Sequence, residues 1–192
     1  MQVIRNVLAA IGALALVAGA AGYVVVEGFL GRLDPDAPRI FKEVGARYLE
    51  TLDPGTTLVR SERVKAGLTP EDVVASLKSL AVQNNLLFVG EAAFYKQVEA
   101  VTGKPYRFIS FYSFCDAQVG ALMADYNNTY TAFMPCRIAV VQDPDGTLWL
   151  QMMDLDMLIH AGKPLPPELK QGALKVRAAL NKVIEGAANG EF

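Results

Sequence analysis

The chain has 192 residues and a formal net charge of −2, from 18 basic and 20 acidic side chains. This length allows one ordinary domain and a short additional segment, but not two large domains. Because no block of Lys and Arg stands out, we expect no nucleic acid among its partners. Two cysteines and one histidine, with no CxxC motif, leave little material for a metal cage built from protein ligands alone.

Residues 7–26 form an uncharged apolar run near the start of the sequence. About 20 such residues are enough for a helix to cross the hydrocarbon core of a bilayer. A cleaved signal peptide is the alternative, because Ala18-Gly19-Ala20 resembles a small-residue cleavage site. We favour a retained transmembrane anchor over residues 1–31, because the run continues through 23–26 and exceeds the apolar region of a signal peptide.

Four small residues recur on one face of the predicted anchor helix, with spacings of three, four and three: Gly12, Ala15, Gly19 and Gly22. Helices in lipid associate where small residues let their backbones approach closely. We therefore expect this face to pack against another transmembrane protein or a second copy of the chain. Arg5 precedes the run and the segment before it is short, which favours a single pass through the bacterial inner membrane with the C-terminal domain in the periplasm.

The remainder of the chain alternates between helical and extended patterns. Residues 32–56 are expected to form a linker and an amphipathic helix over 38–52, and residues 57–192 a domain. Its predicted helices are 70–82, 95–101, 116–125 and 167–184, and its predicted strands are 57–65, 86–92, 107–114, 137–142 and 147–153. We expect strands 107–114 and 137–142 to be parallel, joined by a right-handed crossover through the helix between them. The fold class is thus α+β, with a mixed β-sheet packed by helices.

One stretch, FYSFCDAQVGALMADYNNTYTAFMPCRIAVVQDPDGTLWL, resembles a bacterial and archaeal family known as domain of unknown function 302. The resemblance covers about residues 67–159 and rests on Phe114-Cys115-Asp116, Met134-Pro135-Cys136-Arg137 and Asp145-Gly146. Asp116 departs from the Asn that is commoner in this family. The resemblance implies a small α+β fold that often dimerises, with no settled biochemical role. Membrane-anchored members resemble proteins of chemolithotrophic and sulfur-oxidising bacteria.

The two cysteines are the residues best suited to chemistry. Cys115 lies at a predicted junction of strand and helix, where the helix N-terminus would lower the pKa of its thiol, while the neighbouring Asp116 would oppose this. A buried cysteine acting as a small hydrophobic residue is the alternative. In the predicted parallel arrangement, Cys115 ends one strand and Cys136 begins the next at the opposite edge of the sheet. We therefore expect free thiols, with a disulfide as the alternative.

Soft donor atoms are numerous in the second half of the chain. Together with the two cysteines, the candidate donors are Met123, Met134, Met152, Met153, Met157 and His160. Thiolate, thioether and imidazole groups suit Cu(I) or a haem iron. Their spacing matches no ligand motif, and methionines near a sheet commonly fill a core. We therefore predict no cofactor, and a soft metal ion or haem bound by Cys115, Cys136, Met134 and His160 stays open.

These observations favour a membrane-anchored, non-catalytic accessory protein or subunit. It would dock on a membrane complex through its anchor and its α+β domain, in sulfur or respiratory metabolism. The alternative is a redox or ligand-binding protein that depends on a thiol, a metal or haem and uses Cys115 and Cys136.

Overall fold

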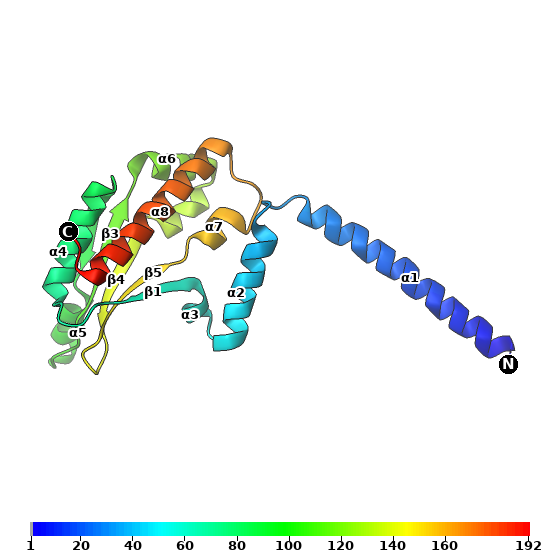
Figure 1. Ribbon diagram of the computed structural model, residues 1–192, viewed down its shortest axis with the longest axis horizontal. Helices are drawn as coiled ribbons and strands as arrows, with labels where there is room; N and C mark the ends of the chain where they lie inside the picture. Colours follow the sequence, from blue (N-terminus) through cyan, green and yellow to red (C-terminus); the bar gives the residue numbers. More distant parts are fainter. Residues whose placement is uncertain (1) are drawn as a thin grey trace.

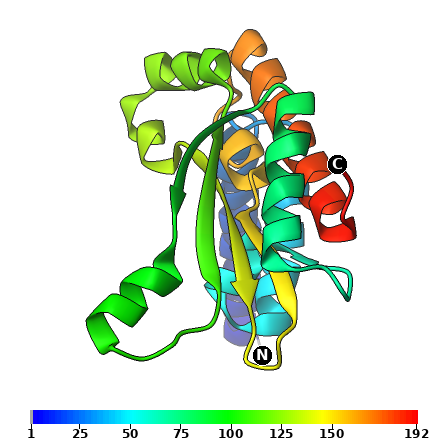
Figure 2. The ribbon, with the colours of Figure 1, turned by 90° about the vertical axis from the view of Figure 1, so that its left-hand side faces the viewer.

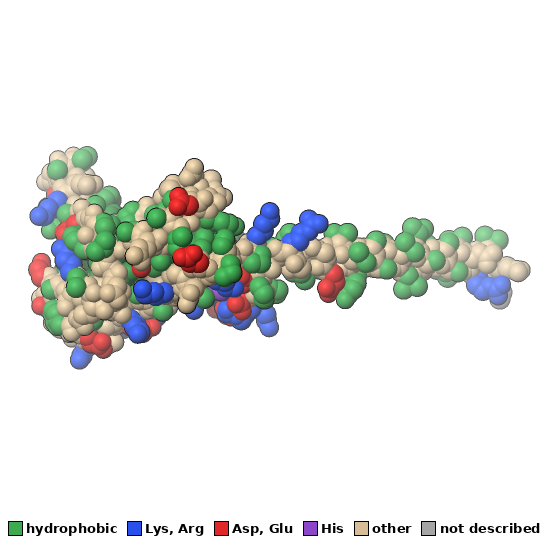
Figure 3. Space-filling model, turned by 90° about the horizontal axis from the view of Figure 1, so that it is seen from above, with side chains coloured by type: hydrophobic (Ala, Val, Ile, Leu, Met, Phe, Trp, Pro, Cys, Tyr) green, Lys and Arg blue, Asp and Glu red, His purple; other side chains and the backbone are tan. Residues whose placement is uncertain are grey.

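The computed structural model describes residues 2–192. Helix α1 (Gln2–Leu30) projects away from the domain formed by the rest of the chain (Figure 1). None of its residues is buried, and hydrophobic side chains cover it between charged groups near its two ends (Figure 3). Its 29 residues, with a mean hydropathy of 2.2 over an 18-residue window, make it long and apolar enough to span a membrane. A core helix of a soluble domain would instead be mostly buried.

Five strands form one sheet in the order β1-β5-β4-β3-β2. Their bounds are Val59–Arg63 (β1), Leu87–Ala92 (β2), Ile109–Cys115 (β3), Cys136–Gln142 (β4) and Leu148–Met153 (β5). Every neighbouring pair is antiparallel. The prediction of a mixed sheet, with 107–114 and 137–142 parallel, is therefore wrong. The chain between β3 and β4 folds back at the same edge of the sheet, so that β4 begins where β3 ends and Phe114 pairs with Cys136.

Two helices cover one face of this sheet, α4 (Pro70–Gln83) and α8 (Pro167–Asn189) (Figures 1 and 2). Alternate strand residues point into the core beneath them, among them Tyr112, Phe114, Ile138, Val140 and Leu150. Full burial of one such aliphatic or aromatic side chain contributes about 1.5–3 kcal/mol. The α+β fold class predicted from the sequence is thus confirmed, with α4 and α8 packed on one side of the sheet.

Local signals account for where several helices begin. Thr69 caps α4: its hydroxyl accepts from the Asp72 backbone N–H, and the Asp72 carboxylate accepts from the Thr69 backbone N–H. This reciprocal pair satisfies two of the donors that a helix start leaves without partners. Residues 38–52 also form the predicted amphipathic helix, α2 (Ala37–Thr51), which buries Ala37 and Ile40. Both helices were predicted correctly to within one or two residues.

The remaining elements are short. They are α3 (Pro54–Leu58), α5 (Phe94–Thr102), α6 (Ala117–Tyr126), the 3₁₀ helix η1 (Asn128–Phe133) and α7 (Asp156–His160). Helix α5 stands apart from the other helices beyond the end of β2 (Figure 2). The sequence patterns predicted neither α3, η1 nor α7, and α8 continues past the predicted end at residue 184 to Asn189. Each of the three missed helices has only five or six residues, too few to show a helical period.

Candidate functional site

The residues of the two cysteine motifs meet at one edge of the sheet. Cys115 is the last residue of β3 and Cys136 is the first residue of β4. Because these strands are antiparallel neighbours, both cysteines lie at the same edge, and Cys136 pairs with the residue that precedes Cys115. The connecting segment returns through α6 and η1 to a cis Met134–Pro135 peptide bond directly before Cys136. The motifs therefore converge in space, although 20 residues separate the two cysteines in the sequence.

A small apolar hollow opens at this edge, between the end of the sheet, α6 and α8. Its volume is about 70 Å³, and four sulfur-bearing side chains line it: Cys115, Met123, Met134 and Cys136. We call it the sulfur pocket. The aromatic side chains of Tyr130 and Phe133, both from η1, form part of its wall. Its one charged lining residue is Asp116.

Both thiols are protonated at neutral pH. Burial, with a contribution from Cys115, raises the pKa of Cys136 to about 11. Burial also raises the pKa of Cys115, with a contribution from the Asp116 carboxylate. The expectation that the helix N-terminus would lower the pKa of Cys115 is wrong, because burial of the thiol and the Asp116 carboxylate raise it, and Asp116 itself caps the helix. Its Oδ1 accepts from the backbone N–H groups of Gln118 and Val119, each at 3.1 Å.

The two thiols are free in the structure, as expected. The argument that led to this expectation is nevertheless wrong, because it placed the cysteines at opposite edges of the sheet. Both cysteines instead line the sulfur pocket. The sequence reasoning failed at the connection between the strands, where residues 127–135 are long enough for the chain to fold back.

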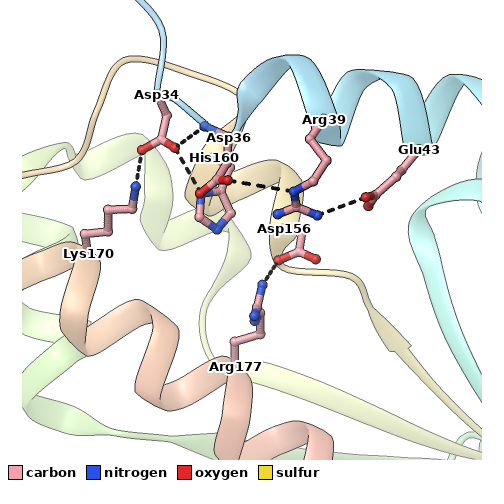
Figure 4. A network of polar contacts seen from close by, with 8 residues as sticks. All are labelled: Asp34, Asp36, Arg39, Glu43, Asp156, His160, Lys170 and Arg177. Carbon is pink, nitrogen blue, oxygen red and sulfur yellow. Dashed lines mark hydrogen bonds and ion pairs between the residues drawn. The ribbon is translucent and has the colours of Figure 1, made fainter.

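His160 does not join the sulfur residues. It lies in α7 with its side chain buried, and its Nδ1 atom lies 3.1 Å from Asp34 Oδ1 and 3.5 Å from Asp36 Oδ2 (Figure 4). The Lys170 ammonium, from α8, donates to the other oxygen of Asp34. The hypothesis that His160 binds a soft metal together with Cys115, Cys136 and Met134 therefore has no support in the geometry.

The contacts of Asp34 form a latch between the segment that follows α1 and the domain. We use this name for Asp34, His160 and Lys170. The Asp34 backbone N–H also donates to the Gly162 carbonyl at 2.8 Å. Burial by itself would raise the pKa of Asp34, but hydrogen bonds from Lys170, the Asp36 backbone and His160 outweigh it and lower that pKa to about 2. Asp34 is thus an ionised, buried carboxylate that holds the chain emerging from α1.

The ligand atoms of Asp34, Asp36 and His160 lie within 4.8 Å of one another, a spacing that would suit a metal ion. The ammonium of Lys170 already neutralises Asp34, however. A divalent ion at this position would have to displace Lys170 or tolerate its charge. The arrangement is therefore better described as a structural ion pair with a histidine than as a metal centre.

A broader groove of about 440 Å³ lies on the face of the sheet opposite α4 and α8. Outward-facing residues of β3, β4 and β5 line it, among them Phe111, Arg137 and Met153. The Arg137 guanidinium carbon lies 5.2 Å from the centre of the Phe111 ring. The groove shares Met134, Pro135 and Cys136 with the sulfur pocket. The segment from Met134 to Arg137 therefore separates two hollows: the apolar sulfur pocket, and the groove that the Arg137 side chain lines.

The predicted packing residues of the anchor lie on an exposed part of α1. Gly12, Ala15, Gly19 and Gly22 are all exposed, and no other atom lies within 4 Å of a Cβ built on any of the three glycines. Their face is therefore open to a neighbour, and its use as a packing face stays a prediction.

Sequence reasoning missed Asp34, Lys170 and Gly120. Asp34 is 1% exposed although it follows the anchor in a segment rich in Gly, Asp and Pro, where an acidic side chain is ordinarily solvated. Its partners lie 126 and 136 residues away, so no local signal could have found them. Gly120, in the middle of α6, carried a usable signal, because glycine inside a helical pattern often marks a close approach.

Comparison with known proteins identifies the domain. The family model described as "Domain of unknown function DUF302" matches residues 61–187, a longer stretch than the resemblance over 67–159. The crystal structure of an uncharacterized conserved protein DUF302 from Bacillus stearothermophilus is similar to this chain, with a TM-score of 0.55 and 17% sequence identity. The similarity covers 67% of this chain and 96% of that one, and at this identity it shows the fold alone. No match was found among curated proteins. The chain therefore belongs to the DUF302 family, and an N-terminal apolar helix precedes the matched domain.

Proposed function

We propose that this chain is a membrane-anchored accessory protein, which docks on a membrane complex and carries out no reaction itself. The observation that carries the proposal is α1, an exposed apolar helix long enough to cross a bilayer. The latch supports it, because Asp34 fixes the chain to α7 and α8 only four residues after α1 ends. A domain held this close to the membrane surface is suited to contact another membrane protein.

The chemistry of the sulfur pocket also supports a non-catalytic role. Both thiols have raised pKa values, so neither is a ready nucleophile at neutral pH. Asp116, the one charged residue that lines the pocket, is engaged as the cap of α6. No lining side chain is therefore placed to act as a general base for a thiol.

We propose that the small-residue face of α1 contacts the transmembrane partner. Gly19→Leu places a large side chain in the middle of this face and would hold the partner backbone away. Ala21→Leu is the matched control, because position 21 lies on the opposite side of the helix. Membranes carrying each variant are extracted with a mild detergent, and the size of the extracted complex and its co-purifying chains are determined.

We expect Gly19→Leu to reduce association with another transmembrane protein or a second copy, and Ala21→Leu to leave it intact. Equal association in both variants would remove the packing claim. Orientation is tested separately with a reporter fused to the C-terminus that is active only outside the cytoplasm. Activity supports a periplasmic domain at the inner membrane, and its absence refutes that orientation.

The alternative function is that of a protein that depends on a thiol, a metal or haem. The size of the sulfur pocket limits which of these ligands it could hold. Pockets for small organic ligands measure about 300–1,000 Å³, whereas this pocket measures about 70 Å³. Haem does not fit without rearrangement of α6 and η1. Four sulfur-bearing side chains meet in this pocket, so the ligand that this alternative favours is a single soft metal ion.

A further inference from the structure

We propose that the sulfur pocket binds one Cu(I) ion through Cys115, Cys136 and Met134, with Met123 as a further donor. The proposal concerns the domain alone and does not depend on whether α1 packs against a partner. Three separate parts of the chain bring the donors together: the end of β3, α6, and the segment that leads into β4. All four side chains line the same hollow.

Gly120 shows how closely two of the sulfur atoms approach. A Cβ built on this residue would lie 3.5 Å from Cys115 Sγ and 3.6 Å from Met134 Sδ. Both sulfur atoms are therefore within van der Waals contact of one point beside α6. Cys136 belongs to the same group, because it lines the same hollow as Cys115 and Met134.

The nature of the donors selects the ion. Magnesium and calcium require several oxygen ligands, and the one carboxylate that lines the pocket, Asp116, is occupied by two backbone N–H groups. Zinc sites use Cys, His, Asp and Glu, but half of the sulfur donors here are thioethers. A mixture of thiolate and thioether sulfur in an apolar setting is the donor set preferred by Cu(I).

The size and access of the pocket agree with a single ion. A volume of about 70 Å³ exceeds the space of one water molecule but is well below that of an organic cofactor. Both cysteines are partly exposed, so an ion can reach the sulfur atoms from solvent. No change of oxidation state is involved: the ion enters as Cu(I) and remains Cu(I).

Binding is coupled to proton release. Each cysteine must lose its proton to serve as a thiolate ligand. Up to two protons therefore leave the site when the ion binds, and the apparent affinity rises with pH over the neutral range. A site that used only the two thioethers would show no such dependence.

The test is a titration of the full-length chain in detergent micelles with Cu(I), without oxygen and against a chromogenic Cu(I) chelator as competitor. We expect one Cu(I) per chain, with a sulfur-only coordination shell in X-ray absorption spectra. Absence of binding in competition with the chelator would overturn the proposal. So would a shell dominated by nitrogen or oxygen, or a Zn(II) affinity equal to that for Cu(I).

Four variants separate the site from the fold. Cys115→Ser and Met134→Leu each remove one donor, and each should weaken Cu(I) binding by about tenfold or more, at least the loss seen when a second-shell partner of a metal is removed. Gly120→Ala removes no donor but fills the point between Cys115 and Met134. It should also weaken binding, although alanine is the better helix former and α6 should remain stable.

Met157→Leu is the control, because Met157 does not line the sulfur pocket. It should bind Cu(I) as tightly as the unmodified chain. If Gly120→Ala and Cys115→Ser both retain full affinity, the ion is bound elsewhere and the proposal is refuted. Loss of Cu(I) binding in the two variants with an unchanged circular dichroism spectrum supports it.

Discussion

Replacement of Asp34 by Asn tests the latch that joins the anchor to the domain. The substitution keeps the shape of the side chain and removes its charge. Asp34 is 1% exposed and contacts Lys170, the Asp36 backbone and His160. An asparagine can present an acceptor to only one side of this cluster, so its amide group would meet a donor where the second carboxylate oxygen now lies.

The size of the effect follows from the pKa of Asp34, which is lowered from 3.8 to about 2. A shift of nearly two pKa units corresponds to about 2 kcal/mol of stability when the carboxylate is ionised. Removal of one partner from a buried ion pair costs about 3–5 kcal/mol, but Lys170 is partly exposed and recovers some hydration. We therefore expect Asp34→Asn to lose about 2–3 kcal/mol at neutral pH.

The loss should be concentrated near the latch. Hydrogen exchange of the full-length chain in detergent should show faster exchange in residues 33–40 and in α7 than in the sheet, together with a lower melting temperature. Asp36→Asn is the matched control, because that side chain is about half exposed and lies 3.5 Å from His160. Its effect should remain within about 0.5 kcal/mol, as for other surface substitutions.

The contribution of Asp34 to folding stability should depend on pH in a defined direction. The pKa of Asp34 is lower in the folded state than in the unfolded state, so its contribution is complete above about pH 5 and is lost as the pH falls through about 2. The difference in stability between the unmodified chain and Asp34→Asn should shrink across this range. Equal stability at pH 7, or a difference that does not change between pH 5 and pH 2, would refute the role assigned to Asp34.

Three further predictions concern the stability of the domain. Thr69→Ala removes the cap of α4 and should lower the free energy of unfolding by about 1 kcal/mol, measured by thermal unfolding. Thr69→Ser, which keeps the capping hydroxyl, is its control. Ile184→Ala should cost about 2–5 kcal/mol, because Ile184 is fully buried in the main core; a loss below 1 kcal/mol would contradict its position there. Cys136→Ser should lower the melting temperature more than Cys115→Ser, since Cys136 packs against the main core, and the reverse order would show that their roles are exchanged.

The helices and turns that are specified by residues close together in the sequence were predictable. Thr69-Pro70 marked the start of α4, and the apolar spacing of 38–52 marked α2. Asp145-Gly146 marked the hairpin between β4 and β5, where Gly146 has a φ of +89°. In each case the signal and the structure that it specifies lie within a few residues of each other.

The pairing of β3 with β4 could not be predicted in the same way. A strand, a helix and a second strand are compatible with a parallel crossover, and equally with a chain that folds back at one edge of the sheet. The return depends on how α6 and η1 pack against α8 and the sheet end, a tertiary arrangement that leaves no periodic pattern. The wrong choice placed Cys115 and Cys136 at opposite edges and concealed the sulfur pocket.

Only part of the candidate site could be predicted from the sequence, because the sequence shows the donor residues but not which of them meet in space. The motifs around Cys115 and Cys136 were recognisable, and the structure brings them together with Met134 and Met123. His160 was included because its side chain is a soft donor, yet its partner is Asp34, which lies 126 residues away in the sequence. Residue type identified the donors, but only the fold determines which donors meet.

The central claim, that α1 is retained as a membrane anchor, is tested most directly by the intact mass of the chain extracted from membranes. The account predicts the mass of the full chain, with α1 present, in the membrane fraction after a high-salt wash. A mature protein that begins near Ala21, recovered without detergent, would contradict it and would show that the apolar run is a cleaved signal peptide.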